Sequence, residues 1–395
     1  MTKSSQTHLL YFAPDFEPRR YRLVELPTEV AELFKSHGAE SQRQNLQIKG
    51  HPNDEAVLCT NASTHALKDV QISNTMLIAR PVQSVPPHLS ISSFADGLVD
   101  DENGTDDGHG VYEIQDSLNS YVEVVPILPR LDQLRDLLIA GAFKGPDDDD
   151  VVAGELCTRQ QLMETVQASD EEIEKGLKDL SALEINGHYR MIDPLYMERV
   201  LTLILNIVVS EDLELNCVPL HTCTSELADH DDVPNYMIKH VLESFASSVD
   251  EGLQRYTLSR EKIAKFYGVQ LLATAHPKEW PLQTFITAWK ESVLDLIDVS
   301  LNVLRGTFLK ESGPNGAVYL KYYPKHILTS MDAKSRFEYL FRTRSKWTLD
   351  ELVPYIEDLA GDKKKLDAIL LKYARASGDK CNVTYTSRFV IAGVK

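Results

Sequence analysis

The chain has 395 residues, of which 43% are hydrophobic and 25% are charged, and it carries a formal net charge of −18. One hydrophobic core rarely covers a chain of this length, so we expect two to four domains, and the composition is that of a folded protein. The first residues lack a signal-peptide core and no apolar run approaches the roughly 20 residues of a membrane span, so we expect neither secretion nor membrane insertion.

The cysteines and the charge distribution further narrow the classes of protein to which the chain can belong. The five cysteines are widely spaced and include no C-x-x-C pair, so we expect neither a disulfide framework nor a zinc site. The strongly acidic average hides a basic end. Residues 321–395 hold 15 Lys and Arg against 9 Asp and Glu, which leaves the rest of the chain markedly acidic.

Residues 1–125 read mostly as short strands in which apolar and polar residues alternate. The expected strands are Tyr21–Leu26, Leu46–Lys49, Ala56–Cys59, Leu67–Ile72, Met76–Arg80 and Tyr121–Val125. The turn residues of 50–54 separate two of them. We therefore predict a small antiparallel sheet or half-barrel, whose exposed edges a partner chain could complete by supplying strands.

Two breaks follow in the chain. Residues 84–110 are rich in acidic residues, glycine and proline, and we predict a mobile acidic loop there. In 126–155, leucines at helical spacing indicate a helix near 128–140, and the run "GPDDDD" then interrupts the pattern. We predict that this stretch is a helix and an acidic linker between domains.

The pattern after the linker changes to helices followed by brief hairpins. Capping-box pairs at Thr158 with Gln161 and at Ser169 with Glu172 mark two helix starts. Asn186-Gly187, the favoured two-residue hairpin turn, then separates two short strands. Two helices and a hairpin within 156–215 are typical of a winged helix.

A related order recurs less clearly in 216–325 and in 326–395. The last segment contains a third capping box, Thr348 with Glu351, a helix lined by apolar residues from Leu366 to Tyr373, and a terminal strand. The three tryptophans fall in apolar patterns, so we expect Trp280, Trp289 and Trp347 in the core. The predicted fold is α+β and multidomain: an N-terminal antiparallel β-barrel-like domain completed by partner chains, then three winged-helix domains.

Two long segments carry a family resemblance. They are "TRQQLMETVQASDEEIEKGLKDLSALEINGHYRMID" and "RSKWTLDELVPYIEDLAGDKKKLDAILLKYAR". With the order of the domains, they resemble the DCC family (Defective in sister Chromatid Cohesion 1). The resemblance covers 150–395, and the N-terminal strands fit it in general pattern.

The resemblance implies a nuclear adaptor without catalytic activity of its own. Family members join chromosome transmission fidelity proteins 18 and 8 through the β-domain, which forms a barrel shared among the three chains. This module joins a replication factor C-like complex, with the replication factor C small subunits, that loads or unloads the clamp PCNA during DNA replication. It also binds the catalytic part of DNA polymerase epsilon, supports cohesion, and uses winged helices on single- and double-stranded DNA without sequence preference.

The basic end supplies the only candidate site. At about 100° per residue, Lys365 and Lys372 share one face of the last helix, Lys364 and Arg375 lie about 80° around, and the apolar stripe is opposite that second pair. In a winged helix such cations neutralise phosphates without reading sequence. The predicted DNA-binding residues are Lys363, Lys364, Lys365, Lys372, Arg375, Lys380 and Arg388. A Lys-rich face that only keeps the helix soluble is the alternative.

The sequence lacks the short motifs that are typical of several enzyme classes. The sequence contains no G-x-x-x-x-G-K-[ST] loop, G-x-S-x-G elbow or H-E-x-x-H motif, so we predict no catalytic residues, metal or cofactor. The competing hypothesis is a nuclear transcription-type scaffold, in which the same winged helices bind proteins rather than DNA. The two hypotheses differ in the partners they predict.

Overall fold

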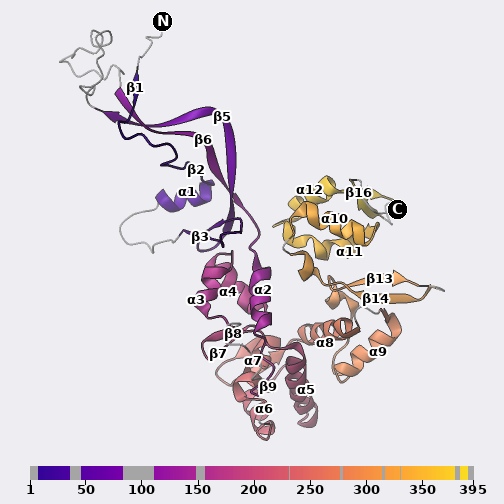
Figure 1. Ribbon diagram of the computed structural model, residues 1–395. Coiled ribbons are helices and arrows are strands. Elements are labelled where there is room, and N and C mark those ends of the chain that lie inside the picture. The colour runs from indigo at the N-terminus through magenta and orange to yellow at the C-terminus, as the bar shows by residue number, and fades with distance from the viewer. Residues whose placement is uncertain are drawn as a thin grey trace, which may run out of the picture. The chain divides into compact units, whose positions relative to one another are not determined.

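The structure is a computed structural model that describes residues 8–35, 46–82, 111–147, 156–230, 232–275, 279–313, 316–329, 331–378 and 383–389 (Figure 1). The chain forms two compact units, residues 1–127 (unit 1) and residues 128–395 (unit 2). The predicted acidic loop at 84–110 lies outside the described residues. Among the described helices, none is long and apolar enough to cross a membrane.

Unit 1 is built on one six-stranded sheet and one helix. Its elements are β1 (Leu9–Phe12), β2 (Val24–Glu25), α1 (Thr28–Lys35), β3 (Gln47–Lys49), β4 (Val57–Cys59), β5 (Thr64–Val82) and β6 (Val111–Pro126). The strand order is β1-β6-β5-β4-β3, and β2 also pairs with β6. The path does not close on itself, because it ends at β1 and β3.

The sheet is mixed, so the predicted antiparallel arrangement is wrong for two strands. Both β1 and β2 run parallel to β6, whereas the other pairs are antiparallel. Alternating apolar and polar residues mark a strand but not its direction. Direction follows from connections, and a long connection between β1 and β6 imposes no hairpin geometry.

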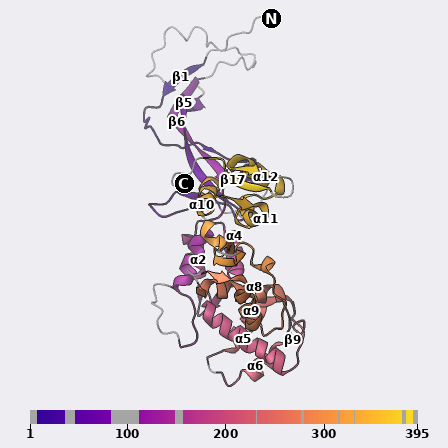
Figure 2. The same cartoon turned by 90° about the vertical axis from the view of Figure 1, so that its right-hand side faces the viewer.

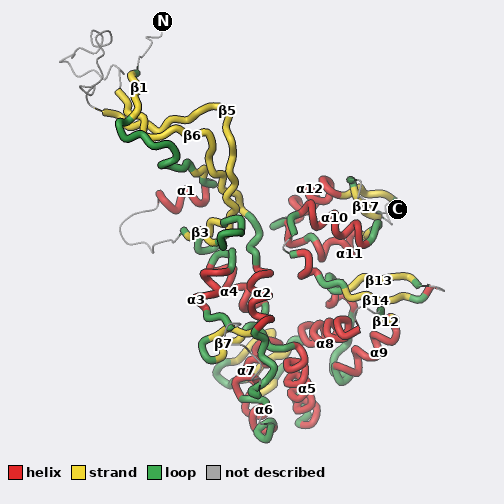
Figure 3. Tube along the Cα trace, in the orientation of Figure 1, coloured by secondary structure: helices red, strands yellow, loops and turns green. Residues whose placement is uncertain are grey.

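A long ribbon of β5 and β6 dominates unit 1, and the two strands run side by side in both views (Figures 1 and 2). The predicted strands Leu67–Ile72 and Met76–Arg80 are parts of the single strand β5. Between them the register shifts, so that residues 72–75 of β5 lie opposite Asn119 alone. Extra residues on one strand bend a ribbon, and β5 and β6 bend together in Figure 3.

Unit 2 repeats one order of elements four times among its described residues: a helix, a short strand, two further helices and a hairpin. Repeat 1 (131–190) holds α2 (Leu131–Ala140), α3 (Arg159–Thr165), α4 (Asp170–Asp179), β7 (Leu183–Ile185) and β8 (His188–Arg190). Its short strand is reduced to a bridge between Cys157 and Tyr189.

Repeats 2 and 3 follow the same order with a short strand of two residues. Repeat 2 (194–258) holds α5 (Pro194–Ser210), β9 (Val218–Pro219), α6 (Leu220–Glu226), α7 (Asn235–Phe245), β10 (Ala246–Asp250) and β11 (Arg255–Leu258). Repeat 3 (260–322) holds α8 (Arg260–Ala275), β12 (Trp280–Pro281), α9 (Leu282–Ser292), the 3-10 helix η2 (Leu301–Leu304), β13 (Phe308–Ser312) and β14 (Val318–Tyr322).

Repeat 4 (333–387) follows the 3-10 helix η4 (Lys325–Leu328). It holds α10 (Ala333–Thr343), β15 (Trp347–Thr348), α11 (Leu349–Leu352), the 3-10 helices η5 (Val353–Tyr355) and η6 (Glu357–Leu359), α12 (Lys363–Tyr373), β16 (Ala374–Ser377) and β17 (Thr384–Ser387). Its strand order, β15-β17-β16, matches β9 and its hairpin in repeat 2 and β12 and its hairpin in repeat 3. The three helices α10, α11 and α12 lie together in both views (Figures 1 and 2).

The sequence predicts three helix–hairpin units, whereas the described chain has four. The difference begins at α2, which lies in the predicted linker 126–155. Leu134 and Leu138 of α2 are buried in one core with Ile173 and Leu177 of α4. Because the "GPDDDD" run interrupts the sequence pattern between α2 and α3, the pattern assigns α2 to a linker. The packing of the core shows that α2 belongs to repeat 1. The predicted segment 216–325 accordingly contains the end of repeat 2 and all of repeat 3.

The short strand and the following helix form the same joint in each repeat. In repeats 2, 3 and 4 the second strand residue is also the helix N-cap: Pro219, Pro281 and Thr348. Thr158 has the same place after Cys157 in repeat 1. All three predicted capping boxes are confirmed, with both reciprocal hydrogen bonds present in each.

Tryptophans anchor the cores of repeats 3 and 4, as predicted. Trp289 and Trp347 are fully buried, and their indole N–H groups donate to the carbonyls of Ala264 (2.7 Å) and Arg344 (2.8 Å). Trp280 is half-buried and donates to the Leu271 carbonyl (2.9 Å). Each indole therefore places its apolar body in the core without an unsatisfied donor.

A buried arginine joins three segments of the C-terminal part. Arg336 of α10 is only 1% exposed, and its guanidinium contacts both carboxylate oxygens of Asp358 at 2.7 Å. It also donates to the carbonyls of Thr329, Met331 and Tyr355. The charge is thus paired and hydrogen-bonded, which is the condition for burying it without a large loss.

Replacing Arg336 with methionine should lower the free energy of unfolding of the C-terminal repeat by about 3 kcal/mol, because a carboxylate and three carbonyls lose their donor. Urea unfolding followed by tryptophan fluorescence measures it. Lys334→Met is the matched control: Lys334 lies 4.0 Å from Glu338 on the surface, so its loss should cost under about 0.5 kcal/mol. Equal losses in the two variants would contradict the structural role of Arg336.

Candidate functional site: a basic helix and an open strand edge

The basic site predicted from sequence is built on α12. This helix begins directly after Asp362, whose carboxylate accepts from the Lys365 backbone N–H at 2.8 Å and caps the first turn. Lys363, Lys364 and Lys365 all lie exposed on that turn. Positive side chains at a helix N-terminus oppose the helix dipole, at a cost of a few tenths of a kcal/mol each. Helix stability therefore does not explain this cluster.

The two faces of α12 have different composition. Leu366, Ile369, Leu370 and Tyr373 belong to the core of repeat 4. Lys364 and Lys372 lie on the outer face, and the rise of 1.5 Å per residue separates them by about 12 Å along the axis. Leu371 shares this outer face and is 72% exposed. Leu371 follows Leu370 directly in an apolar run, so the sequence pattern gives no sign that its side chain is exposed.

The two predicted arginines lie beyond the helix rather than on it. Arg375 was placed on a face of the last helix, but α12 ends at Tyr373 and Arg375 belongs to β16, opposite Thr386 of β17. Residues around α12's C-terminus leave the helical geometry because β16 starts at once. The angle of 80° calculated for Arg375 is therefore wrong, although its side chain remains exposed.

Arg388 has a structural contact that the sequence did not reveal. Its backbone N–H donates to the Tyr373 carbonyl at 3.1 Å, and its guanidinium donates to the Leu371 carbonyl. It thereby satisfies carbonyls at the C-terminus of α12 and places a positive charge at the negative end of the helix dipole. These contacts hold Arg388 at the C-terminal end of α12, the helix that carries Lys372. Lys380 lies outside the described residues.

Other cations of the basic end are held in internal pairs. Arg344 lies 4.3 Å above the Trp347 ring and forms two hydrogen bonds with the Glu351 carboxylate. Burial would raise the pKa of Glu351, but the hydrogen bonds and charge of Arg344, with the bonds from Thr348, outweigh it and lower the pKa. Arg336 is enclosed as described above. These two arginines add no accessible charge for a ligand.

A second candidate surface is the open edge of β5 in unit 1. In the described part of the chain, residues 67–71 and 76–82 of β5 pair with β6 on one edge. No described strand pairs with 67–82 on the other edge, because β4 reaches only Thr64–Ala66. Two apolar side chains of the same sheet are exposed: Ile48 of β3, at the level of His65, by 70%, and Leu77 of β5 by 44%. An unpaired edge flanked by exposed apolar residues is a template for strand addition.

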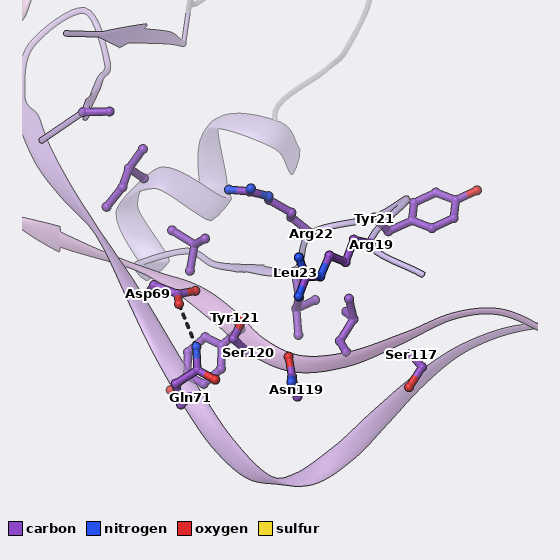
Figure 4. A pocket seen from close by; sticks show the side chains of 14 residues that line it. Arg19, Tyr21, Arg22, Leu23, Asp69, Gln71, Ser117, Asn119, Ser120 and Tyr121 are labelled. Carbon is purple, nitrogen blue, oxygen red and sulfur yellow. Dashed lines mark hydrogen bonds between the residues drawn. The ribbon is translucent and has the colours of Figure 1, made fainter. Parts of the chain in front are cut away.

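A pocket of about 560 Å³ lies over the paired strands β5 and β6, beside the loop before β2 (Figure 4). Arg19, Tyr21 and Arg22 line it from the loop, and Asn119 lines it from the bulge of the ribbon. On β5, the Gln71 side-chain amide donates to Asp69 at 2.8 Å. The pocket thus presents hydrogen-bonding groups of both strands and of the loop, which lies on the β6 side because β2 pairs with β6.

One buried carboxylate holds that loop in place. Asp116 of β6 is fully buried, and its oxygens accept from the backbone N–H groups of Tyr21 (2.7 Å), Arg19 (3.0 Å) and Ser117 (2.7 Å). The hydrogen bond from Tyr21, with those from Ser117, Arg19 and Arg20, lowers the pKa of Asp116 although burial acts in the opposite direction. Arg19 adopts a positive φ of 70°, a conformation that this anchoring fixes.

Within the described ranges, no group of three or more His, Cys, Asp or Glu side chains is placed to hold a metal ion. Cys59, Cys157, Cys217 and Cys223 form no disulfide within the described part of the chain. The two candidate surfaces present exposed cations along a helix and, within the described chain, a strand edge without a partner strand.

Comparisons with known proteins converge on one family. The family model described as "Sister chromatid cohesion protein Dcc1" matches residues 21–356. The chain is 32% identical over 375 residues to Sister chromatid cohesion protein DCC1 of Homo sapiens, covering 93% of this chain and 88% of that protein. The protein of the same name from Saccharomyces cerevisiae is 27% identical over 404 residues, covering 95% and 98%. The family-model match ends before α12.

Changing Asp116 to asparagine should release the loop, because the amide nitrogen cannot accept from the backbone N–H groups. We expect faster hydrogen exchange at the amides of Arg19 and Tyr21, measured by NMR or mass spectrometry. Since the folded-state pKa is lowered, the wild-type anchor should hold above about pH 4 and be lost as the pH falls through that lowered pKa. Asp54→Asn, in an exposed turn, is the control. Unchanged exchange in the Asp116 variant would contradict the anchoring role.

Proposed function

The chain belongs to the Dcc1 family of sister chromatid cohesion proteins, and on that premise we propose that it is a non-catalytic adaptor that joins partner chains through unit 1 and DNA through repeat 4. The observation that carries the proposal is the open edge of β5. A strand of 19 residues with backbone groups free along most of one edge is suited to association with another chain. In this role the protein works in the nucleus.

We propose that unit 1 joins chromosome transmission fidelity proteins 18 and 8, and that their strands complete a barrel with its sheet. The open path from β1 to β3 supports this, since a closed barrel needs strands beyond those of one open sheet. Exposed Ile48 and Leu77 would become buried against the added strands. Burying the parts that are now exposed would contribute about 1 kcal/mol for Leu77 and about 1–2 kcal/mol for Ile48.

We propose that the four repeats of unit 2 are winged-helix domains. The order of helix, short strand, two helices and hairpin supports this assignment, and in it α12 is the third helix of repeat 4 and β16–β17 its wing. The third helix of such a domain commonly lies against DNA. Lys364, Lys365 and Lys372 would then contact phosphates, which gives salt-sensitive binding without sequence preference.

Assembly through unit 1 would place the chain in an alternative replication factor C-like complex, with the replication factor C small subunits and PCNA. In that complex the chain would support cohesion and contact the catalytic part of DNA polymerase epsilon. The partners would supply ATP hydrolysis. A nuclear transcription-type scaffold is the competing proposal, and recovery of RNA polymerase or transcription factors with the chain would favour it.

Changing Lys364, Lys365 and Lys372 together to glutamate should weaken binding of the full-length protein to duplex DNA at least about 10-fold. The slope of log affinity against log salt should fall by up to about 3, because three phosphate contacts are lost. Fluorescence anisotropy over a salt series measures both quantities.

The matched control changes the same number of charges elsewhere: Lys239, Lys265 and Lys290, exposed on α7, α8 and α9, become glutamate. We expect a small loss of affinity and an unchanged salt slope. Equal effects from the two triple variants would mean that only net charge matters, and the α12 site would then be wrong.

Changing Ile48 and Leu77 to aspartate should remove partner chains from the full-length protein. A charge at a position that becomes buried against an added strand is strongly unfavourable. Affinity purification of tagged protein from nuclear extract should recover the clamp-loader subunits with the wild type and at least about 10-fold less with the variant. Leu195→Asp, on the exposed surface of α5, is the control. Equal recovery would overturn the proposed interface.

A further inference from the structure

Phe389 is an exposed aromatic residue at the end of the basic face. It follows β17 and Arg388, and it is 53% exposed. Tyr373 is the last residue of α12. The ring centroids of Phe389 and Tyr373 are 6.3 Å apart, with an interplanar angle of 57°. A large apolar ring left half in solvent beside two cations is not explained by the core of repeat 4.

The backbone around Phe389 is fixed by local hydrogen bonds. Its N–H donates to the Ser387 hydroxyl at 3.2 Å, and that hydroxyl donates to the Phe389 carbonyl at 2.7 Å. Arg388 attaches the same segment to the end of α12 through the Tyr373 and Leu371 carbonyls. The backbone that carries the ring is therefore held in place before any ligand binds, which lowers the entropy cost of using it.

Tyr373 supports the ring from behind. It is half-buried and stacks on Phe337 of α10, with ring centroids 5.4 Å apart and an interplanar angle of 24°. The Lys372 ammonium lies 5.2 Å from the centre of the Tyr373 ring. Aromatic rings thus continue from the core of repeat 4 to the surface, and cations lie beside the exposed end.

We propose that Phe389 stacks on an unpaired base, so that the basic face of repeat 4 binds single-stranded DNA in preference to a closed duplex. The inference rests on the proposed DNA binding by α12 and extends it to the form of DNA. Lys364, Lys365 and Lys372 contact the phosphates of the strand, and the ring receives one base beyond Lys372.

Stacking gives the preference its physical basis. Each base of a duplex is covered on both faces by its neighbours, whereas a single strand presents base faces that an aromatic side chain can cover. Every base has such a face, so stacking favours single strands without favouring a sequence. Phosphate contacts alone give no comparable selection for unpaired bases.

The test uses full-length protein with a 20-nucleotide oligothymidine strand and, separately, a 20-base-pair duplex. Phe389→Ala should weaken binding of the single strand about 5- to 10-fold and leave duplex binding unchanged. The salt slope should match that of the wild type, because the same phosphates are contacted. Tyr236→Ala, at a ring of similar exposure (46%) on α7, should change neither affinity.

Two further substitutions separate stacking from simple apolar contact and from altered folding. Phe389→Tyr keeps the ring and should bind like the wild type, whereas Phe389→Leu keeps apolar volume and should bind as weakly as the alanine variant. Wild-type affinity with leucine, or equal losses on single strand and duplex, would overturn the inference. The first of these results would point to an apolar contact with the strand that does not need an aromatic ring.

Failure of the stacking proposal can be distinguished from failure of the proposed DNA binding by α12. If the triple glutamate variant of Lys364, Lys365 and Lys372 weakens both DNA forms while Phe389→Ala weakens neither, the phosphate site stands and only stacking is wrong. If the triple variant leaves both DNA forms unchanged, the proposed DNA binding by α12 fails as well.

Discussion

The unpaired edge of β5 is the constraint from which the properties of unit 1 follow. Each residue of a strand carries backbone groups that must be hydrogen-bonded when water is excluded. Along 67–71 and 76–82, β6 pairs with one edge of β5, residues 72–75 form the bulge, and the other edge has no strand within the described chain. The backbone groups of the free edge can be satisfied by water while the edge is exposed, or by the backbone of another chain that adds a strand. The exposed apolar side chains of Ile48 and Leu77 fit a sheet that is covered by another chain better than one that faces water.

Unit 2 is built differently, because each repeat supplies its own helices and hairpin, and repeats 2 and 3 share one hydrophobic core. The joint between short strand and helix recurs, with a core residue followed at once by the N-cap, as in Val218-Pro219 and Trp347-Thr348. Since the scaffold is repeated, differences in function must arise from surface residues. Repeat 4 differs by the lysines of α12, by Arg388 at the helix end, and by the exposed ring of Phe389.

Local signals in the sequence were sufficient wherever a structure depends on neighbouring residues. The capping boxes, and the Asn186-Gly187 turn with both residues at positive φ, formed as predicted. Features set by distant contacts were missed: the direction of β1, the packing of α2 on α4, and the capping of α12 by Arg388. Repeated pairs such as Trp280-Pro281 and Trp347-Thr348, each followed by leucine, were the available signal for four repeats rather than three.

The central claim is that another chain pairs with the free edge of β5. Amide hydrogen exchange of residues 67–82 tests it directly, in the purified chain and in the complex recovered from nuclear extract. In the purified chain, amides directed to the free edge should exchange rapidly, and in the complex they should be protected together with those facing β6. Exchange that is equally rapid in both samples, or already slow in the purified chain, would contradict the account.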